Sequence, residues 1–184
     1  MKLYKKIIPT QTVLTVRDIN FDKLKEQGVK ALFFDLDNTL IPYDINLIPE
    51  DIKAFLEDLN KDFKVVVVSN SRQKRVGYAT SSLEGIPYVK FSRKPLKFGF
   101  KKALKLANVK AGEVAIIGDQ LMTDIFGANR LKAHTAILVF PIKQKSDHIL
   151  TRFNRKIENR FIKKVAKKHP EIYNEVLKDY AESK

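Results

Sequence analysis

The chain has 184 residues, of which 44% are hydrophobic and 30% are charged, a balance that supports one domain with a buried core and excludes a disordered, collagen-like or coiled-coil chain. It contains no cysteine, which excludes disulfides, cysteine-ligated metals and thiolate nucleophiles. The formal net charge of +14 favours partners that carry anionic groups such as phosphate, although a basic surface kept for solubility explains it equally well.

The first half of the chain predicts two strands that alternate with helices. A continuous apolar run at residues 31–34 is typical of a strand buried on both faces, and it ends at Asp35. Residues 49–59 begin with a proline and two acids and then place apolar residues at helical spacing, which predicts a helix. A second buried strand follows at residues 63–68, and the basic segment from there to Leu83 predicts another helix.

The alternation continues through the second half. We expect strands at residues 88–91, 114–117 and 135–140, and helices at residues 96–108 and 124–131. Five strands joined through helices predict parallel pairing with right-handed crossovers. The fold class is therefore α/β, a doubly wound, Rossmann-like parallel sheet of about five strands with helices on both faces.

We expect a single domain over residues 1–184. Residues 29–142 form its core, residues 1–28 form an extension that packs on the core, and residues 143–184 form a basic amphipathic helical segment. This segment either docks on its own domain, which is slightly favoured, or binds a lipid surface, RNA or another chain.

No apolar run approaches the roughly 18 residues that span a bilayer. The N-terminus also lacks the apolar stretch of a signal peptide. We therefore expect a cytoplasmic protein without a transmembrane segment; its oligomeric state is left open.

Polar side chains follow the predicted strands. Asp35, Asp37 and Thr39 alternate along the run that leaves the first strand, Ser69 ends the second strand, and Lys94 follows the third. Ligands of doubly wound sheets bind at the carboxyl ends of the strands. Two carboxylates so close together repel each other, and a Mg²⁺ ion between them offsets this repulsion because it prefers oxygen ligands.

Four segments in this order resemble the motifs of the haloacid-dehalogenase-like (HAD) superfamily of phosphohydrolases, over about residues 29–140. The strings DLDNTL, SNSR, KP and GDQ-x-x-TD resemble subfamily IIIA and its YqeG-type branch, which is related to mitochondrial phosphatidylglycerophosphate phosphatases. The matching residues are, in order, Asp35, Asp37, Ser69, Lys94, Asp119 and Asp124.

The resemblance implies a two-step phosphoryl transfer. Asp35 attacks phosphorus and becomes an aspartyl-phosphate, and Asp37 acts in turn as general acid and general base. Lys94 offsets charge on the phosphoryl group. The phosphate-binding groups that it implies are Thr39, Ser69, Asn70 through its backbone N–H, and Lys94.

The resemblance also implies Mg²⁺ as the cofactor. Its ligands are the Asp35 carboxylate, the Asp37 backbone carbonyl and the Asp119 carboxylate, with waters completing the coordination. Asp124 acts on the metal through a water or by orienting Lys94.

Each of these residues has a simpler structural interpretation as well. Ser69 and Asn70, and likewise Asp119 and Asp124, are residue types that cap the helices predicted to follow them. Lys94 is one of eleven lysines and arginines in residues 72–110, so a solvated loop charge is its alternative.

The histidines carry no such pattern. His134, His148 and His169 lack a partner at metal-ligand spacing, and we interpret them as surface or packing residues. Tyr43 and Phe98 either line the mouth of the site or, more simply, pack against their neighbours.

The spacing of the motifs bears on the substrate. The intervals 41–68 and 70–93 are too short for the cap domain that many HAD phosphatases insert there, which favours a large or surface-bound phosphorylated substrate. With the basic segment 72–110 and the amphipathic tail, this favours a lipid phosphate such as phosphatidylglycerophosphate, met by peripheral contact with the anionic inner face of the membrane. A polynucleotide or small-metabolite phosphatase is the alternative.

Two interpretations of other kinds remain. The basic faces could bind RNA or a ribonucleoprotein with little phosphatase activity, although no RNA-binding motif is present. A phosphoacceptor receiver domain has a similar α/β sheet. In receivers, however, the phosphorylated Asp follows a later strand, whereas Asp35 follows the first strand of the predicted core.

Overall fold

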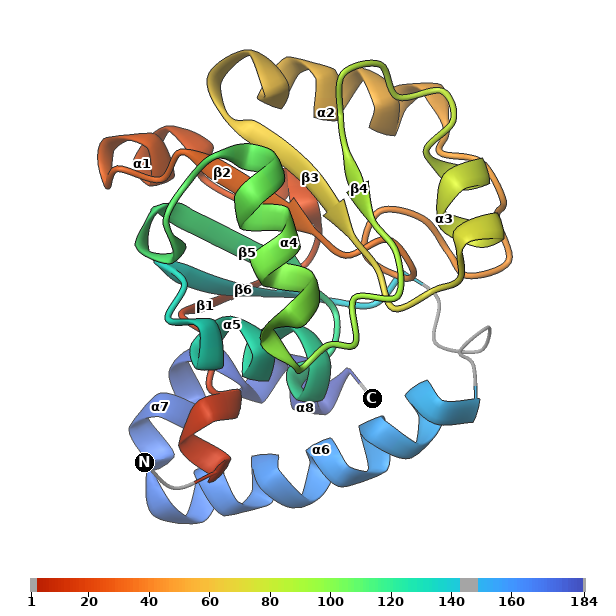
Figure 1. Ribbon diagram of the computed structural model, residues 1–184. Coiled ribbons are helices and arrows are strands. Elements are labelled where there is room, and N and C mark those ends of the chain that lie inside the picture. Colours follow the sequence, from red (N-terminus) through yellow and green to blue (C-terminus); the bar gives the residue numbers. More distant parts are fainter. Residues whose placement is uncertain (1–2, 143–148, 184) are drawn as a thin grey trace.

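The computed structural model describes the backbone of residues 3–142 and 149–183, and the side chains of residues 4–142 and 157–183. Its centre is one parallel sheet of six strands in the order β1-β6-β5-β2-β3-β4 (Figure 1). The strands are β1 (Gln11–Val13), β2 (Ala31–Phe34), β3 (Lys64–Val68), β4 (Tyr88–Val89), β5 (Val114–Gly118) and β6 (Thr135–Val139).

The predicted α/β class and the five expected strands are confirmed. The sixth strand, β1, comes from the N-terminal extension and pairs with β6 at the edge of the sheet, with Gln11 opposite Ile137. It has only three residues, all of them half-buried. Such a strand leaves no alternation of apolar and polar residues long enough to be recognised in the sequence.

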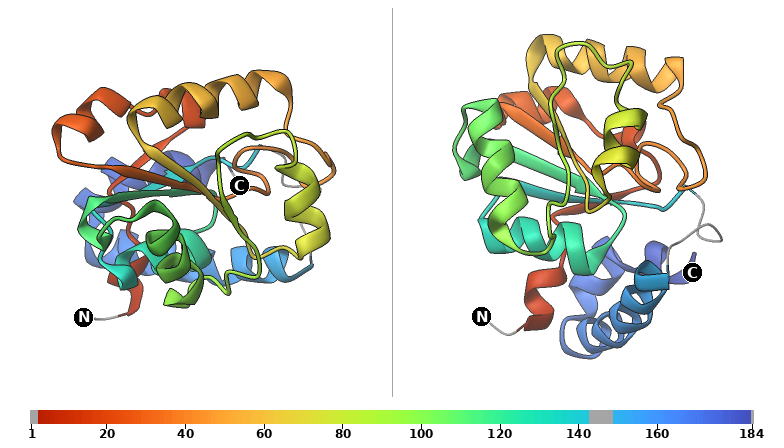
Figure 2. Two further views of the ribbon diagram at one scale, coloured as in Figure 1. Left: turned by 45° about the horizontal axis from the view of Figure 1, so that its top comes forward. Right: turned by 45° about the vertical axis from the view of Figure 1, so that its right-hand side comes forward.

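Helices cover both faces of the sheet, as the edge-on view in Figure 2 (left) shows. On one face lie α1 (Phe21–Glu26), α2 (Glu50–Asp62) and α3 (Gln73–Ala79), and on the other lie α4 (Lys97–Ala107) and α5 (Phe126–Leu131). The strand residues alternate between the two cores: Leu32 and Phe34 pack toward α2, whereas Ala31 and Phe33 pack toward α4.

Short helical turns join these elements. They are η1 (Leu3–Ile7), η2 (Val16–Asp18), η3 (Ala111–Glu113) and the π-helical turn η4 (Leu121–Ile125). The last of these begins shortly after the end of β5 and carries Asp124, so it shapes the carboxyl edge of the sheet.

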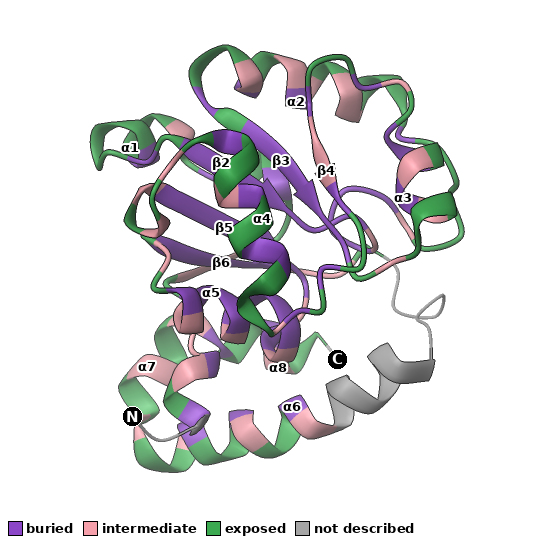
Figure 3. Cartoon of the chain, in the orientation of Figure 1, coloured by how far each residue is buried: buried purple, intermediate pink, exposed green. Residues whose placement is uncertain are grey.

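The C-terminal helices lie against the α5 side of the domain (Figure 1). They are α6 (Ile149–Lys168), α7 (Pro170–Val176) and α8 (Lys178–Glu182). Ile162 and Val165 of α6 are buried, and within residues 157–168 the outer face of the helix is exposed (Figure 3). The side chains of Ile149, Leu150 and Phe153, which also belong to the predicted apolar stripe, lie outside the described residues.

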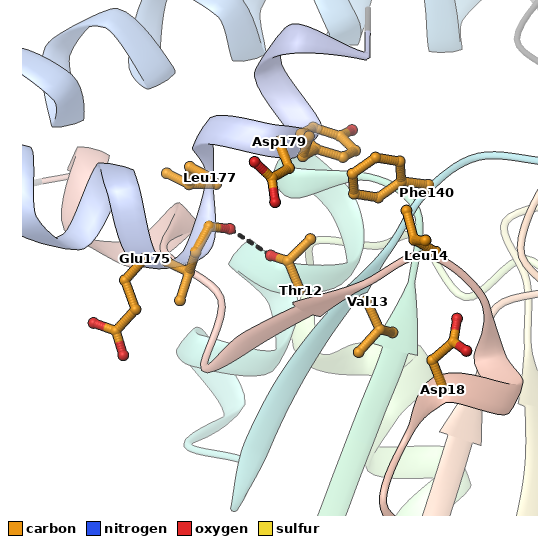
Figure 4. Close-up of a pocket in the computed structure, with 10 residues that line it drawn as sticks. Thr12, Val13, Leu14, Asp18, Phe140, Glu175, Leu177 and Asp179 are labelled. Atoms are coloured by element: carbon orange, nitrogen blue, oxygen red, sulfur yellow. Dashed lines mark hydrogen bonds between the residues drawn. The ribbon is translucent and has the colours of Figure 1, made fainter.

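The tail also reaches the edge strand β1. The Thr12 hydroxyl donates a hydrogen bond to the Val176 carbonyl (Figure 4). Tyr180 of α8 packs edge-on against Phe140, with 5.7 Å between ring centroids, and the Leu177 side chain is buried. The N-terminal extension and the C-terminal helices therefore pack together at the β1–β6 side of the sheet.

Among the helices within residues 3–142 and 149–183, none combines the length and apolar character that a membrane crossing requires.

The docking of the tail makes a testable prediction. Val165→Ala removes two methyl groups from a fully buried position and should lower the free energy of unfolding by about 2 kcal/mol. Urea denaturation followed by circular dichroism measures this. Lys163→Ala, exposed on the same helix, should change it by less than about 0.5 kcal/mol. Equal stabilities of the two variants would contradict the packing of α6.

Candidate active site

A buried ion triad lies at the carboxyl edge of the sheet. Lys94 Nζ lies 2.5 Å from Asp35 Oδ1 and 2.6 Å from Asp124 Oδ1. The side chains of Lys94 and Asp124 are 2% and 1% exposed. Lys94 follows β4, Asp35 follows β2 and Asp124 lies within η4, so the topology of the sheet brings together charges that are far apart in the sequence.

The backbone around Asp35 fixes its direction. The Asp35 N–H donates to the Ile117 carbonyl and thereby extends the pairing of β2 with β5 by one residue. The chain then turns sharply, because the Leu36 carbonyl accepts hydrogen bonds from the N–H groups of Leu40 and Ile41. Asn38 has a φ of 62°, in the left-handed region that asparagine tolerates. The nucleophile candidate therefore lies on a rigid, hydrogen-bonded loop.

Burial and the attraction between Asp35 and Lys94 shift the pKa of each of these two residues in opposite directions. Burial raises the pKa of Asp35 well above its ordinary value; Lys94 opposes this, and the nearby carboxylates of Asp124 and Asp119 add to it. Burial lowers the pKa of Lys94, but Asp124 and Asp35 more than offset it, so its pKa lies above the ordinary value. The two carboxylates therefore favour the charged form of Lys94 beside Asp35.

Two of the three carboxylates in a buried cluster contact this cation. Asp35, Asp119 and Asp124 each offer an oxygen, and these oxygens lie within 4.8 Å of one another. One ammonium group does not balance three carboxylates. A divalent cation fits the cluster, since the donor set consists of hard oxygen ligands and carries excess negative charge. Asp124, predicted to orient Lys94, does contact it and also belongs to this cluster.

Asp124 is held from three directions. Its Oδ2 accepts hydrogen bonds from the Gln120 N–H at 3.3 Å and from the Thr123 hydroxyl at 3.1 Å. It also packs against Gly118, where a Cβ atom would lie 2.3 Å from the Asp124 Cγ atom. The glycine at the end of β5 is therefore required by close packing, and it leaves room for the acid that pairs with Lys94.

The Asp37 carboxylate lies apart from the acidic cluster and faces α3. Its Oδ1 accepts from Arg75 Nε and Nη2 at 3.1 and 2.9 Å, and its Oδ2 accepts from the Ser71 hydroxyl at 2.7 Å. Arg75 also donates to the Ile45 carbonyl and lies over the Tyr43 ring. Arg75 was missed by sequence reasoning, because nothing distinguishes it from its basic neighbours.

The predicted phosphate-binding residues differ in their surroundings. Ser69 is buried, and its Oγ accepts from the Ser71 N–H at 3.0 Å. The Asn70 side chain binds the Lys94 loop: its Oδ1 accepts from the Lys94 N–H at 2.7 Å, and its Nδ2 donates to the Lys94 carbonyl. The side chain of Asn70 is thus engaged with the lysine loop, and its backbone N–H is the group predicted to bind phosphate. Thr39 Oγ1 is buried and makes no hydrogen bond to any residue that the structure describes.

The remaining candidates lie outside the cluster. Tyr43 packs on Arg75, and Phe98 is 64% exposed near the start of α4. His134 is exposed, and His169 stacks on Tyr4. His148 lies outside the described residues.

The comparison with known proteins assigns this site to a family. The family described as "Mitochondrial PGP phosphatase" matches residues 1–143. The chain belongs to this family. It is therefore a phosphatase of the HAD type, and the predicted resemblance is confirmed. The family also favours an enzyme over the RNA-binding and receiver interpretations.

The chain is also similar to two curated proteins and to one solved structure. The "Probable phosphatase YqeG" of Bacillus subtilis (strain 168) is 40% identical over 167 residues, covering 90% of this chain and 95% of the relative. The "Glyceraldehyde 3-phosphate phosphatase" of Pyrococcus furiosus is 34% identical over 86 residues, or 42% of this chain and 33% of that protein. The cobalt-bound deoxy-D-mannose-octulosonate 8-phosphate phosphatase of Haemophilus influenzae is 21% identical with a TM-score of 0.43, covering 52% of this chain and 61% of that one.

The buried triad makes a prediction about stability. Lys94→Met leaves the carboxylates of Asp35 and Asp124 without their buried cation and should lower the free energy of unfolding by about 3 kcal/mol in the presence of EDTA. Urea titration measures it. Lys90→Met, an exposed lysine four residues earlier, is the matched control. A Lys94→Met protein as stable as the control would show that the ion triad does not form.

Proposed function

We propose that the protein is a Mg²⁺-dependent phosphomonoesterase that acts through an aspartyl-phosphate on Asp35. The observation that carries this proposal is the buried contact of Asp35 with Lys94 beside the Asp119 and Asp124 carboxylates. This arrangement supports the proposal, because a carboxylate oxygen, a fixed cation and two further carboxylates lie together at one point of the sheet edge.

In the first step, an Asp35 carboxylate oxygen forms a bond to phosphorus while the bond from phosphorus to the alcohol oxygen breaks. Asp37 gives a proton to the departing oxygen. Because Arg75 and Ser71 hold the Asp37 carboxylate in the structure, this role requires Asp37 to exchange them for the leaving group. Arg75 thereby sets how readily the acid reaches the substrate.

In the second step, water attacks phosphorus, Asp37 accepts its proton, and the bond between phosphorus and Asp35 breaks to release inorganic phosphate. The Ser69 hydroxyl and the Asn70 backbone N–H bind the phosphoryl oxygens. Thr39 supplies a further hydroxyl, which has no other described partner.

The residues that would hold Mg²⁺ are Asp35, Asp119 and the Asp37 backbone carbonyl, with Asp124 beside them. When bound, the ion offsets negative charge on the phosphoryl oxygens. Lys94 remains paired with Asp124 throughout, so its ammonium group stays in place when Asp35 carries the phosphoryl group.

The proposed substrate presents its phosphate on a surface. The chain between β2 and β3 contains only α2, and that between β3 and β4 only α3, so within residues 3–142 and 149–183 no inserted domain covers the site. Exposed apolar side chains flank the Lys94 loop at Phe91, Leu96 and Phe98.

Basic residues lie among these apolar side chains. A hollow of about 410 Å³ is lined by Lys90, Phe91, Arg93, Phe98 and Lys102; we call these five residues the rim. Aromatic side chains among lysines and arginines suit the interface of an anionic bilayer. The family is described as a PGP phosphatase, which supports phosphatidylglycerophosphate as the favoured substrate and the inner face of the membrane as the favoured location.

The nucleophile makes the first prediction about activity. Asp35→Asn should lower kcat for Mg²⁺-dependent release of phosphate at least about 1,000-fold, because an amide does not form the acyl-phosphate. The assay offers phosphatidylglycerophosphate in mixed micelles, a soluble aryl phosphate and a phosphorylated oligonucleotide. Asp51→Asn, exposed on α2, should leave turnover unchanged. Retained turnover in a folded Asp35→Asn protein would disprove the mechanism, and activity on the oligonucleotide alone would disprove the lipid substrate.

The rim makes a second prediction. The double variant Phe91→Ala and Phe98→Ala should bind anionic vesicles at least about 10-fold more weakly, since it removes apolar area from the membrane contact. Vesicle flotation measures this, and hydrolysis of the soluble aryl phosphate should be unchanged. Leu106→Ala removes a comparably exposed side chain, 48% exposed, from the far end of α4. Equal flotation of the two proteins would assign membrane contact to another surface or to none.

A further inference from the structure

A chain of hydrogen bonds links the C-terminal helices to the acidic loop of the active site. Glu158 of α6 and Tyr180 of α8 are both fully buried, with 0% exposure. They lie 22 residues apart in the sequence, and the Tyr180 hydroxyl is 3.3 Å from Glu158 Oε2. The burial of a carboxylate in a helix that is otherwise basic on its polar face needs a specific partner, because a buried acid without one is strongly destabilising.

Each of these two residues has a hydrogen-bond partner in the active-site loop. The Tyr180 hydroxyl donates to the Asp119 carbonyl at 2.9 Å. Glu158 Oε1 accepts from the Met122 N–H at 3.2 Å. Met122 lies in the first turn of η4, where backbone N–H groups lack partners within the helix. Glu158 therefore caps this turn from a distant part of the chain.

These contacts hold the loop at two points. Asp119 is fixed at the end of β5 and Met122 at the start of η4, and the carboxylates of Asp119 and Asp124 flank the held segment. A shift of either backbone group would move a carboxylate relative to Asp35. The positions of the carboxylates thus depend on residues that lie beyond the part of the chain matched by the family, residues 1–143.

We propose that Glu158 and Tyr180 are positioning residues of the active site, which hold the backbone of residues 119–122 so that Asp119 and Asp124 are preorganised for the divalent cation. The proposal rests on the proposed function of the acidic cluster as a Mg²⁺ site. The C-terminal helices are in this respect a part of the active site, although none of their described residues belongs to the acidic cluster.

Tyr180→Phe is the sharpest test. It removes one hydroxyl and keeps the ring that packs on Phe140. We expect Mg²⁺ affinity, measured by titration calorimetry on the full-length protein without substrate, to fall about 10-fold, as it does when groups that orient metal ligands are removed. In the metal-free protein, amide hydrogen exchange of residues 119–124 should become at least about 10-fold faster.

Two further variants separate positioning from stability. Val165→Ala loosens the same helix without touching the loop, so it should lower global stability but keep both the Mg²⁺ affinity and the relative protection of residues 119–124. Glu158→Gln keeps an oxygen for the Met122 N–H and should bind Mg²⁺ within about twofold of the wild type, whereas Glu158→Ala should match Tyr180→Phe.

Unchanged Mg²⁺ affinity and loop exchange in Tyr180→Phe would overturn the proposal, as would equal losses in Val165→Ala. A wild-type protein that binds no Mg²⁺ would overturn the cation site. A protein that binds Mg²⁺ but hydrolyses no phosphate ester would overturn the proposed function alone, since neither readout of the positioning role uses turnover.

Discussion

The ammonium group of Lys94 is the constraint on which the carboxyl edge of the sheet depends. It lies almost fully buried between Asp35 and Asp124, where an ion is tolerated only if opposite charges surround it closely. The surrounding residues keep Lys94 and its acidic partners in contact. Asn70 holds the backbone of the lysine loop on both sides, and Gly118 leaves the space that Asp124 occupies. The same contacts keep Asp35, the proposed nucleophile, beside a cation, so the contacts that allow the charge to be buried are also those that the proposed phosphoryl transfer requires.

Much of this arrangement could be predicted from the sequence. Continuous apolar runs mark β2, β3, β5 and β6, because strands buried on both faces need no polar residues. The polar residues directly after those runs predicted the site, since parallel strands end at one edge. Their roles stay predictions, whereas the family and the fold class are confirmed.

What the sequence could not indicate depends on contacts between distant segments. Arg75 is one basic residue among many, and only the fold shows that it meets Asp37. The side chain of Asn70 binds the lysine loop rather than presenting itself to a phosphate, which no local pattern encodes. Glu158 looks like a solvated helix residue until α6 docks and buries it. In each case the partner lies at least 24 residues away in the chain.

The short strand β1 has a further consequence for the sheet. Without it, β6 would be an edge strand of five residues, all buried and mostly apolar, with its hydrogen-bonding groups open to another chain. Strands of that kind template intermolecular pairing and aggregation. β1 covers this edge with three residues and two flanking backbone bonds, from Thr10 to the Ala136 carbonyl and from Phe140 to the Val13 carbonyl. The outer edge of β1 is short and half-buried beneath the C-terminal helices. The N-terminal extension therefore replaces an edge strand that could pair with another chain by one that is protected from such pairing.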